Sequence, residues 1–179
     1  MNRKLAVDID NTLWDMVKPW ISVYNYRYND NIIYDDIIKY DFFNITSKAT
    51  KEDMFNILNK DSFWDSVRPY KYSYEYLEKL NKEFDVYIVT STSYKTTHRK
   101  FEMFFKHFDF IEEHQLIITS RKQLMNVDVM IDDCIDCLRY GDYHKILIDA
   151  PYNRDINDNK IIRVKDMREA YDVIHTLPL

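Results

Sequence analysis

The chain contains a single glycine among its 179 residues, and this scarcity excludes several kinds of binding site. Phosphate loops of the GxGxxG and Walker A types need several glycines, because their backbone must approach the phosphate closely. A phosphate group bound by this chain must therefore be held by side chains, helix N-termini or a metal ion.

Cysteine is also scarce, and neither sign of charge forms a long block. The two cysteines, Cys134 and Cys137, are too few for a disulfide framework. They have the spacing of a redox or zinc pair, but no second pair of ligands accompanies them, so we expect buried small side chains. The net charge of −5 and the lack of a long basic run indicate that no nucleic-acid polymer is a partner.

Long hydrophobic runs are missing as well. No apolar run approaches the roughly 20 residues that cross a membrane, and no signal peptide is recognisable at the start. We therefore expect a cytoplasmic protein without a membrane partner. Hydrophobic residues nevertheless make up 46% of the chain, which is enough for a sizeable core. The length favours one domain with an insertion.

Short apolar runs alternate with helical patterns along most of the chain. The predicted strands lie at 5–7, 85–90, 116–119, 127–131, 145–149 and 161–164, and the predicted helices at 16–28, 76–84, 101–108 and 165–176. This alternation predicts an α/β fold with a doubly wound, mostly parallel sheet. Residues 1–14 and 72–179 would form this core. Residues 15–71 would form a small α-helical cap. No convincing strand is expected from about residue 29 to residue 71, where Thr50 begins the clearest helix, 50–60.

Two carboxylates follow the first predicted strand. Asp8 and Asp10 stand two positions apart, so their side chains start on the same side of the strand. Two like charges this close raise one pKa unless a cation lies between them. The pair suits a Mg²⁺ site, because this ion takes oxygen ligands and shares them with substrate phosphate. The alternative is an ordinary turn after the strand, although an Asx turn needs only one acid.

Hydroxyl and cationic side chains follow the next strands. Thr90 and Ser91 end a strand and either hold a phosphate oxygen or cap the following helix. Lys122 stands where a helix begins, against the preference set by the helix dipole, which makes it a candidate functional cation. Arg121 competes for the same role, and a solvated surface position is the alternative for Lys122.

A further pair of acids, Asp132 and Asp133, ends a later strand and would either complete a metal shell or form a turn. The order of these features resembles the four motifs of the haloacid-dehalogenase-like (HAD) phosphatase superfamily. In that resemblance the motifs are Asp8, Asp10 and Thr12 for the first, Thr90 for the second, Lys122 for the third, and Asp132 with Asp133 for the fourth. The resemblance covers nearly all of the chain.

The sequence is more closely similar to the 5′(3′)-deoxyribonucleotidase family. Members carry a small helical cap after the first motif, and the stretches 38–41 and 61–70 are similar to cap segments of that family. The resemblance implies Mg²⁺-dependent hydrolysis of (deoxy)nucleoside monophosphates through an aspartyl-phosphate. Asp8 would be the nucleophile and Asp10 the general acid and base.

The resemblance also implies the remaining roles at the site. Mg²⁺ would be held by Asp8, the main-chain carbonyl of Asp10, and an acid of the pair Asp132 and Asp133. Thr90, Ser91 and Lys122 would bind the phosphate. The second carboxylate of the first motif, Asp10, favours a phosphomonoester substrate over the substrates of dehalogenases and phosphonatases.

Aromatic residues of the cap are the candidates for the nucleoside pocket. They are Trp14, Phe42, Phe43, Phe63 and Trp64, with the pair Phe63 and Trp64 preferred. The alternative is that they fill the core of the cap. Two other functions stay open at this point: a HAD phosphatase for another small phosphomonoester such as a sugar phosphate, and a catalytically silent module that binds a nucleotide or phosphate. The resemblance also leaves a homodimer open.

Overall fold

The computed structural model describes residues 3–40 and 46–178. Six parallel strands form one sheet in the order β5-β4-β1-β6-β7-β8. The strands are β1 (Lys4–Val7), β4 (Asp85–Thr90), β5 (Leu116–Ile118), β6 (Val129–Asp132), β7 (His144–Ile148) and β8 (Ile161–Val164). The predicted α/β fold with a mostly parallel sheet is confirmed, and each strand lies within two residues of its predicted position.

Successive side chains along each strand point to opposite faces of the sheet and pack into two separate hydrophobic cores. On β1, Leu5 and Val7 belong to the larger core, whereas Ala6 belongs to the smaller one. On β7, Ile146 lies in the larger core and Leu147 in the smaller one. Both faces are therefore buried, which explains why the strands are continuous apolar runs and not amphipathic ones.

Helices cover the sheet on both faces. The helices α4 (Ser73–Glu83) and α7 (Met167–Ile174) pack against each other, α6 (Ile135–Arg139) packs on β6 and β7, and α5 (Thr97–His107) reaches the helix α3 (Asp61–Trp64). The described residues also form the 3₁₀ turns η1 (Tyr34–Asp36), η3 (Glu113–Gln115), η4 (Lys122–Leu124) and η5 (Pro151–Asn153). None of the described helices is long and apolar enough to cross a membrane.

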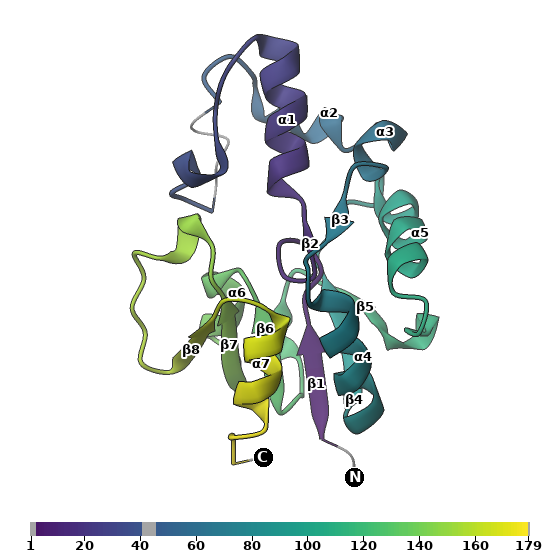
Figure 1. Cartoon of the computed structure of the whole chain (residues 1–179), viewed down its shortest axis with the longest axis vertical. Coiled ribbons are helices and arrows are strands. Elements are labelled where there is room, and N and C mark those ends of the chain that lie inside the picture. Colours follow the sequence, from purple (N-terminus) through teal and green to yellow (C-terminus); the bar gives the residue numbers. More distant parts are fainter. Residues whose placement is uncertain (1–2, 41–45, 179) are drawn as a thin grey trace.

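The helical insertion, residues 16–67, lies beyond the end of the sheet at which β1 ends (Figure 1). It contains α1 (Val17–Tyr28), α2 (Lys51–Ile57) and α3. Helix α2 begins with the predicted cap, because the Thr50 hydroxyl accepts from the amide of Asp53 at 3.1 Å. The insertion therefore places helices directly over the polar ends of the strands.

A short antiparallel ribbon joins the insertion to the core. Its strands are β2 (Trp14–Asp15) and β3 (Arg68–Pro69), and Trp14 pairs with Pro69. The expectation that the region up to residue 71 contains no strand was wrong at this point. Two-residue strands leave no alternating pattern in a sequence, and Pro69 disfavours a strand unless it lies at an edge, as it does here.

Candidate active site

The loop after β1 is shaped by a residue in a left-handed conformation. Asp8 still belongs to the sheet, since its amide donates to the carbonyl of Ile131 at 2.9 Å. Asn11 has a φ of 58°, a conformation that Asn tolerates better than most residues. Its side-chain oxygen accepts from the amides of Met16 at 3.0 Å and Val17 at 3.3 Å. In a chain with one glycine, Asn11 thus both turns the loop and caps α1.

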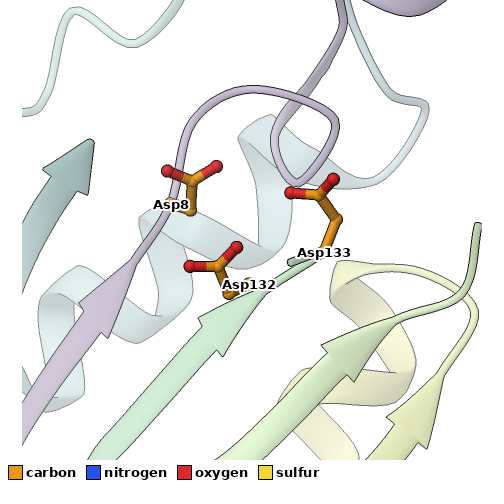
Figure 2. Close-up of side chains that lie close together, drawn as sticks. All are labelled: Asp8, Asp132 and Asp133. Carbon is orange, nitrogen blue, oxygen red and sulfur yellow. The ribbon is translucent and has the colours of Figure 1, made fainter. Parts of the chain in front are cut away.

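Three acids from two strand ends converge at the tip of the sheet. Asp8 follows β1, whereas Asp132 ends β6 and Asp133 follows it, and Figure 2 shows their carboxylates turned toward one region of space. One oxygen of each lies within 4.8 Å of the others, and all three residues are buried. Because β1 and β6 are adjacent and parallel, their carboxyl ends meet at this edge.

Lys122 is the cation of this acidic cluster. Its ammonium group contacts Asp8 and lies 2.7 Å from Oδ2 of Asp132. Lys122 is only 3% exposed, whereas the neighbouring Arg121 is exposed. The structure therefore places Lys122, and not Arg121, at the acids. Burial alone would lower the pKa of Lys122, but Asp132 and Asp8 raise it well above its ordinary value.

The charges of the cluster favour a bound cation. Burial raises the pKa of Asp8 from 3.8 to about 7, and the neighbouring Asp132 adds to this effect although Lys122 opposes it. Burial also raises the pKa of Asp133 well above its ordinary value, with contributions from Asp132 and Asp8. The three buried carboxylates share one ammonium group, which contacts Asp8 and Asp132, so a divalent cation would offset the remaining charge. An all-oxygen donor set fits Mg²⁺.

The carboxylate of Asp10 is held apart from this cluster. Its Oδ1 accepts from the indole nitrogen of Trp14 at 2.8 Å, and its Oδ2 lies 2.6 Å from the ammonium group of Lys100. Lys100 is 1% exposed and also donates to the hydroxyl of Thr90 at 2.7 Å. Asp10 and Thr90, from two different strand ends, therefore share one buried cation.

A cavity of about 280 Å³ opens beside Asp10, between the sheet and the helical insertion. Its polar side comes from residues at the ends of β1 and β4 and from α5, namely Asp10, Asn11, Ser91, Thr92, Ser93, Thr96 and Lys100. Its other side comes from large apolar and aromatic side chains and one tyrosine of the core, namely Met16, Val17, Trp20, Tyr40, Phe55, Leu58, Trp64 and Tyr152. One polar side and one aromatic side are what a small amphipathic ligand needs.

The predicted pocket residues occupy different places. Trp64 lines the cavity, whereas Trp14 and Phe63 do not. Trp14 is completely buried, and its indole nitrogen donates a hydrogen bond to Asp10. Phe63 is 1% exposed because its ring packs on Trp20 and Trp64. Phe42 and Phe43 lie outside the described residues.

Two buried side chains at the site were not among the sequence predictions. Lys100 falls on the buried side of α5 with Met103 and Phe104, and a lysine at an apolar position of an amphipathic helix was the available signal. Tyr152 contacts Asp133 through its hydroxyl. No spacing pattern in the sequence links Tyr152 to Asp133, so the sequence carried no signal for Tyr152 comparable to the one for Lys100.

The cysteines lie beside the site without joining it. Cys134 is buried and Cys137 is partly buried, and neither belongs to the group formed by Asp8, Asp132 and Asp133. A hydrogen bond from Cys137 lowers the pKa of the Cys134 thiol. The amide of Cys134 donates to Oδ1 of Asp132 at 2.9 Å, so the backbone of this segment helps to hold one acid.

Solved structures of HAD-like hydrolases have a similar fold. A predicted phosphatase from Clostridium acetobutylicum matches with a TM-score of 0.67 and 14% identity, over 99% of this chain and 100% of that one. A putative HAD-hydrolase from Bacillus subtilis, solved bound to magnesium, matches with a TM-score of 0.61 and 15% identity, over 97% and 98% of the two chains. At these identities the likeness shows a HAD-like fold.

Relatives with higher sequence identity extend over nearly the whole chain. A 5′(3′)-deoxyribonucleotidase from Clostridium acetobutylicum is 30% identical over 173 residues, which are 97% of this chain and 95% of the relative. A 5′(3′)-deoxyribonucleotidase from Bacillus subtilis is 31% identical over 175 residues, which are 94% of this chain and 96% of the relative. The family model described as 5′ nucleotidase, deoxy (pyrimidine), cytosolic type C protein (NT5C) matches residues 2–177. The chain therefore belongs to the deoxy (pyrimidine) cytosolic type C family of 5′ nucleotidases, which are hydrolases.

Proposed function

We propose that this protein removes phosphate from (deoxy)nucleoside monophosphates in a Mg²⁺-dependent reaction. The observation that carries this proposal is the position of the loop after β1. Asp8 on this loop belongs to the acidic cluster, while Asp10, two residues later, lines the aromatic cavity. A phosphate bound at the acids would thus leave its organic group in the cavity. The names of the relatives, 5′(3′)-deoxyribonucleotidase, support the same substrate class.

The chemistry assigned to Asp8 is attack on phosphorus. The new bond joins an oxygen of Asp8 to phosphorus, and the bond from phosphorus to the sugar oxygen breaks. In its protonated form, Asp10 gives its proton to the leaving sugar oxygen, and the resulting carboxylate then takes a proton from the water that hydrolyses the aspartyl-phosphate. This second step regenerates Asp8 and releases inorganic phosphate.

The groups around Asp8 suit phosphoryl transfer. The ammonium group of Lys122 and the hydroxyl of Thr90 would offset the charge on the equatorial phosphate oxygens. The carboxylates of Asp8, Asp132 and Asp133, together with the main-chain carbonyl of Asp10, are the oxygen atoms that would hold the ion. Bound there, Mg²⁺ would supply positive charge to a phosphate oxygen.

The helical insertion would act as a substrate-selecting cap. We propose that residues 15–71 form this cap over a core made by residues 1–14 and 72–179, because the chain crosses between them at the β2–β3 ribbon. The acids and Lys122 contact only the phosphate, so the choice of nucleoside falls to the cavity wall. Trp64 and Trp20 are the two tryptophans on that wall. An apolar wall near the sugar would disfavour a ribose 2′-hydroxyl, which would lose its hydrogen-bond partners.

The nucleophile is tested with Asp8→Asn, which removes the attacking oxygen but keeps the size of the side chain. We expect phosphate release from dUMP to fall by at least about 10³-fold while the protein stays folded, because an amide is a poor nucleophile. Asp136→Asn is the matched control, since Asp136 is an exposed acid three residues beyond Asp133. Release at the wild-type rate by Asp8→Asn would rule out the covalent route.

The metal and the substrate class are tested by chelation and by a substrate panel. We expect EDTA to abolish turnover and added Mg²⁺ to restore it. We expect dUMP and dTMP to be hydrolysed faster than UMP and than a sugar phosphate. EDTA-resistant activity would contradict the metal site, faster turnover of UMP would contradict deoxy selectivity, and preference for the sugar phosphate would contradict the nucleotide assignment.

A further inference from the structure

The loop between β7 and β8 contacts the acid Asp133 at two points. The hydroxyl of Tyr152 donates to Oδ2 of Asp133, and the side-chain amide of Asn153 donates to the main-chain carbonyl of Asp133 at 2.9 Å. The same amide of Asn153 also reaches the carbonyl of Ile148 at 2.9 Å. The loop therefore ties the residue after β6 to the end of β7.

The two contacting residues are themselves firmly placed. Tyr152 is 4% exposed and Asn153 is 1% exposed. The side-chain oxygen of Asn153 accepts from the amide of Ala150 at 3.1 Å, and its main-chain carbonyl accepts from Arg163 at 2.7 Å. A buried donor held in this way can orient its acceptor, because neither partner can turn without losing a hydrogen bond.

The ring of Tyr152 is also contacted by the helical insertion. Tyr40 packs edge-on against it, with 5.7 Å between the ring centroids and 78° between the planes. Both rings line the cavity that contains Asp10. Removing only the hydroxyl of Tyr152 would keep this ring contact and the shape of the cavity.

Among the described residues, no Lys or Arg pairs with Asp133 as Lys122 pairs with Asp8 and Asp132. Those two acids contact Lys122, whereas the side-chain contacts of Asp133 are with Tyr152 and with the hydroxyl of Thr12 at 3.4 Å. Because the Thr12 contact is long, the Tyr152 hydroxyl is the donor that fixes the rotation of the Asp133 carboxylate. An acid that is to bind a metal ion needs this kind of orienting partner.

We infer that Tyr152 is a positioning residue, whose hydroxyl orients Asp133 to bind the divalent cation of the acidic cluster. Tyr152 acts through Asp133 and needs no contact with the phosphate or with the ion. The inference rests on the proposed function, because it requires that the cluster binds Mg²⁺.

The test compares Tyr152→Phe with the wild-type protein by calorimetric titration with Mg²⁺ alone, without substrate. Loss of a partner that orients a metal ligand typically weakens metal binding by about 10- to 100-fold, and we expect a loss in that range. We also expect a parallel rise in the Mg²⁺ concentration needed for half-maximal turnover. Thermal melting of the metal-free variant checks that it is folded.

Tyr143→Phe is the matched control, because the hydroxyl of Tyr143 donates to the main-chain carbonyl of Cys137 at 3.1 Å and not to a carboxylate. It should bind Mg²⁺ as the wild type does. If Tyr152→Phe also binds Mg²⁺ with wild-type affinity, the inference is wrong and the proposed function stands. If the wild-type protein binds no Mg²⁺, the metal site itself is wrong, and the role of Tyr152 falls with it.

Discussion

The ammonium group of Lys100 lies 2.6 Å from Oδ2 of Asp10, although the two residues are separated by 90 positions in the sequence. The indole nitrogen of Trp14 donates to the other oxygen of the same carboxylate at 2.8 Å. Both oxygens of Asp10 therefore have a side-chain donor. The proposed general acid and base is held in a fixed orientation between the loop after β1 and helix α5.

Replacing Lys100 with Met should lower activity far more than stability. The substitution removes the shared cation of Asp10 and Thr90 but keeps the unbranched side chain, and the Asp10 side chain is 32% exposed, so water can solvate it. Because removal of one preorganised polar group from an active site costs about 10²- to 10³-fold in kcat, we expect a loss in that range for Lys100→Met. Steady-state hydrolysis of dUMP and thermal melting measure the two effects.

Lys95→Met is the control for this substitution, since Lys95 is exposed on the loop that precedes α5. It should keep wild-type activity. An active Lys100→Met variant would show that Asp10 needs no cation, and an unfolded one would show that Lys100 serves the fold.

The stability of the metal-free protein should depend on pH through Asp8. Burial raises the pKa of Asp8 from 3.8 to about 7 in the folded state, so between about pH 4 and pH 7 the folded state holds a proton that the unfolded state has released. Stability should therefore fall as the pH rises through this window. The raised pKa of Asp133 acts in the same direction. Saturating Mg²⁺ should reduce the fall, because it stabilises the ionised carboxylates.

Urea denaturation at about pH 5 and about pH 8, with and without Mg²⁺, measures this dependence. The comparison is made with Asp8→Asn, in which the contribution of this carboxyl is absent. A metal-free wild-type protein that gains stability relative to Asp8→Asn as the pH rises would contradict the assignment.

Substitutions at Asn11 should separate its two structural roles. Asn11→Gly keeps the left-handed backbone conformation but loses the acceptor for the amides of Met16 and Val17, whereas Asn11→Ala loses both. We expect the order of stability to be wild type, Gly, then Ala, with a cost of about 1–3 kcal/mol for Ala from the lost cap and the backbone strain. For a protein of this size that corresponds to roughly 2–4 °C in melting temperature per kcal/mol. An alanine variant at least as stable as the glycine variant would contradict this order.

His175 should stabilise the packing of α7 on α4 mainly at low pH. Its Nδ1 faces the carbonyl of Tyr171 at 2.8 Å and its Nε2 faces Glu83 at 2.8 Å, so the doubly protonated ring satisfies both acceptors. These contacts raise the pKa of His175, the carbonyl of Tyr171 having the largest effect. The stabilisation is therefore complete below about pH 6.5 and is lost as the pH rises through the raised pKa.

The gain from this pair should be small, at most about 1 kcal/mol, because the two side chains are 42% and 39% exposed. Urea denaturation of wild type and His175→Ala at about pH 5.5 and about pH 8.5 tests it. The difference between the two proteins should be larger at the lower pH. A difference that grows with pH would show that the neutral ring, and not the charged one, makes the contact.

The sequence allowed the sheet and the meeting of its acidic strand ends to be predicted, and the physical reason is that both depend on local patterns. Apolar runs locate parallel strands, and the carboxyl ends of neighbouring parallel strands must meet. Asp8, Asp132 and Asp133 follow from that rule. The position of the Lys100 side chain could not be predicted from that rule, because its contact with Asp10 depends on how α5 packs against the loop after β1.

The aromatic residues show the same limit at the cavity. Trp14, Phe63 and Trp64 were all candidate pocket residues, with Phe63 and Trp64 preferred, and only the packing of the insertion decides which ring faces the cavity. Trp14 turns its nitrogen to Asp10, and Phe63 packs among other rings, which leaves Trp64 on the wall. The role of Tyr152 could not be predicted from the sequence either, because its contact with Asp133 also depends on tertiary packing.

The antiparallel pairing of Trp14 with Pro69 and of Asp15 with Arg68 brings the two crossing points of the chain together. Because these two points are neighbours, a segment of another length could be inserted between β2 and β3 without changing the path of any strand of the sheet. The insertion, which we propose contacts the organic group of the substrate, could therefore change as one unit without altering the strands that carry Asp8, Asp132 and Asp133. New substrate specificities would then arise by replacement of the insertion, while the core that would bind the phosphate stays the same.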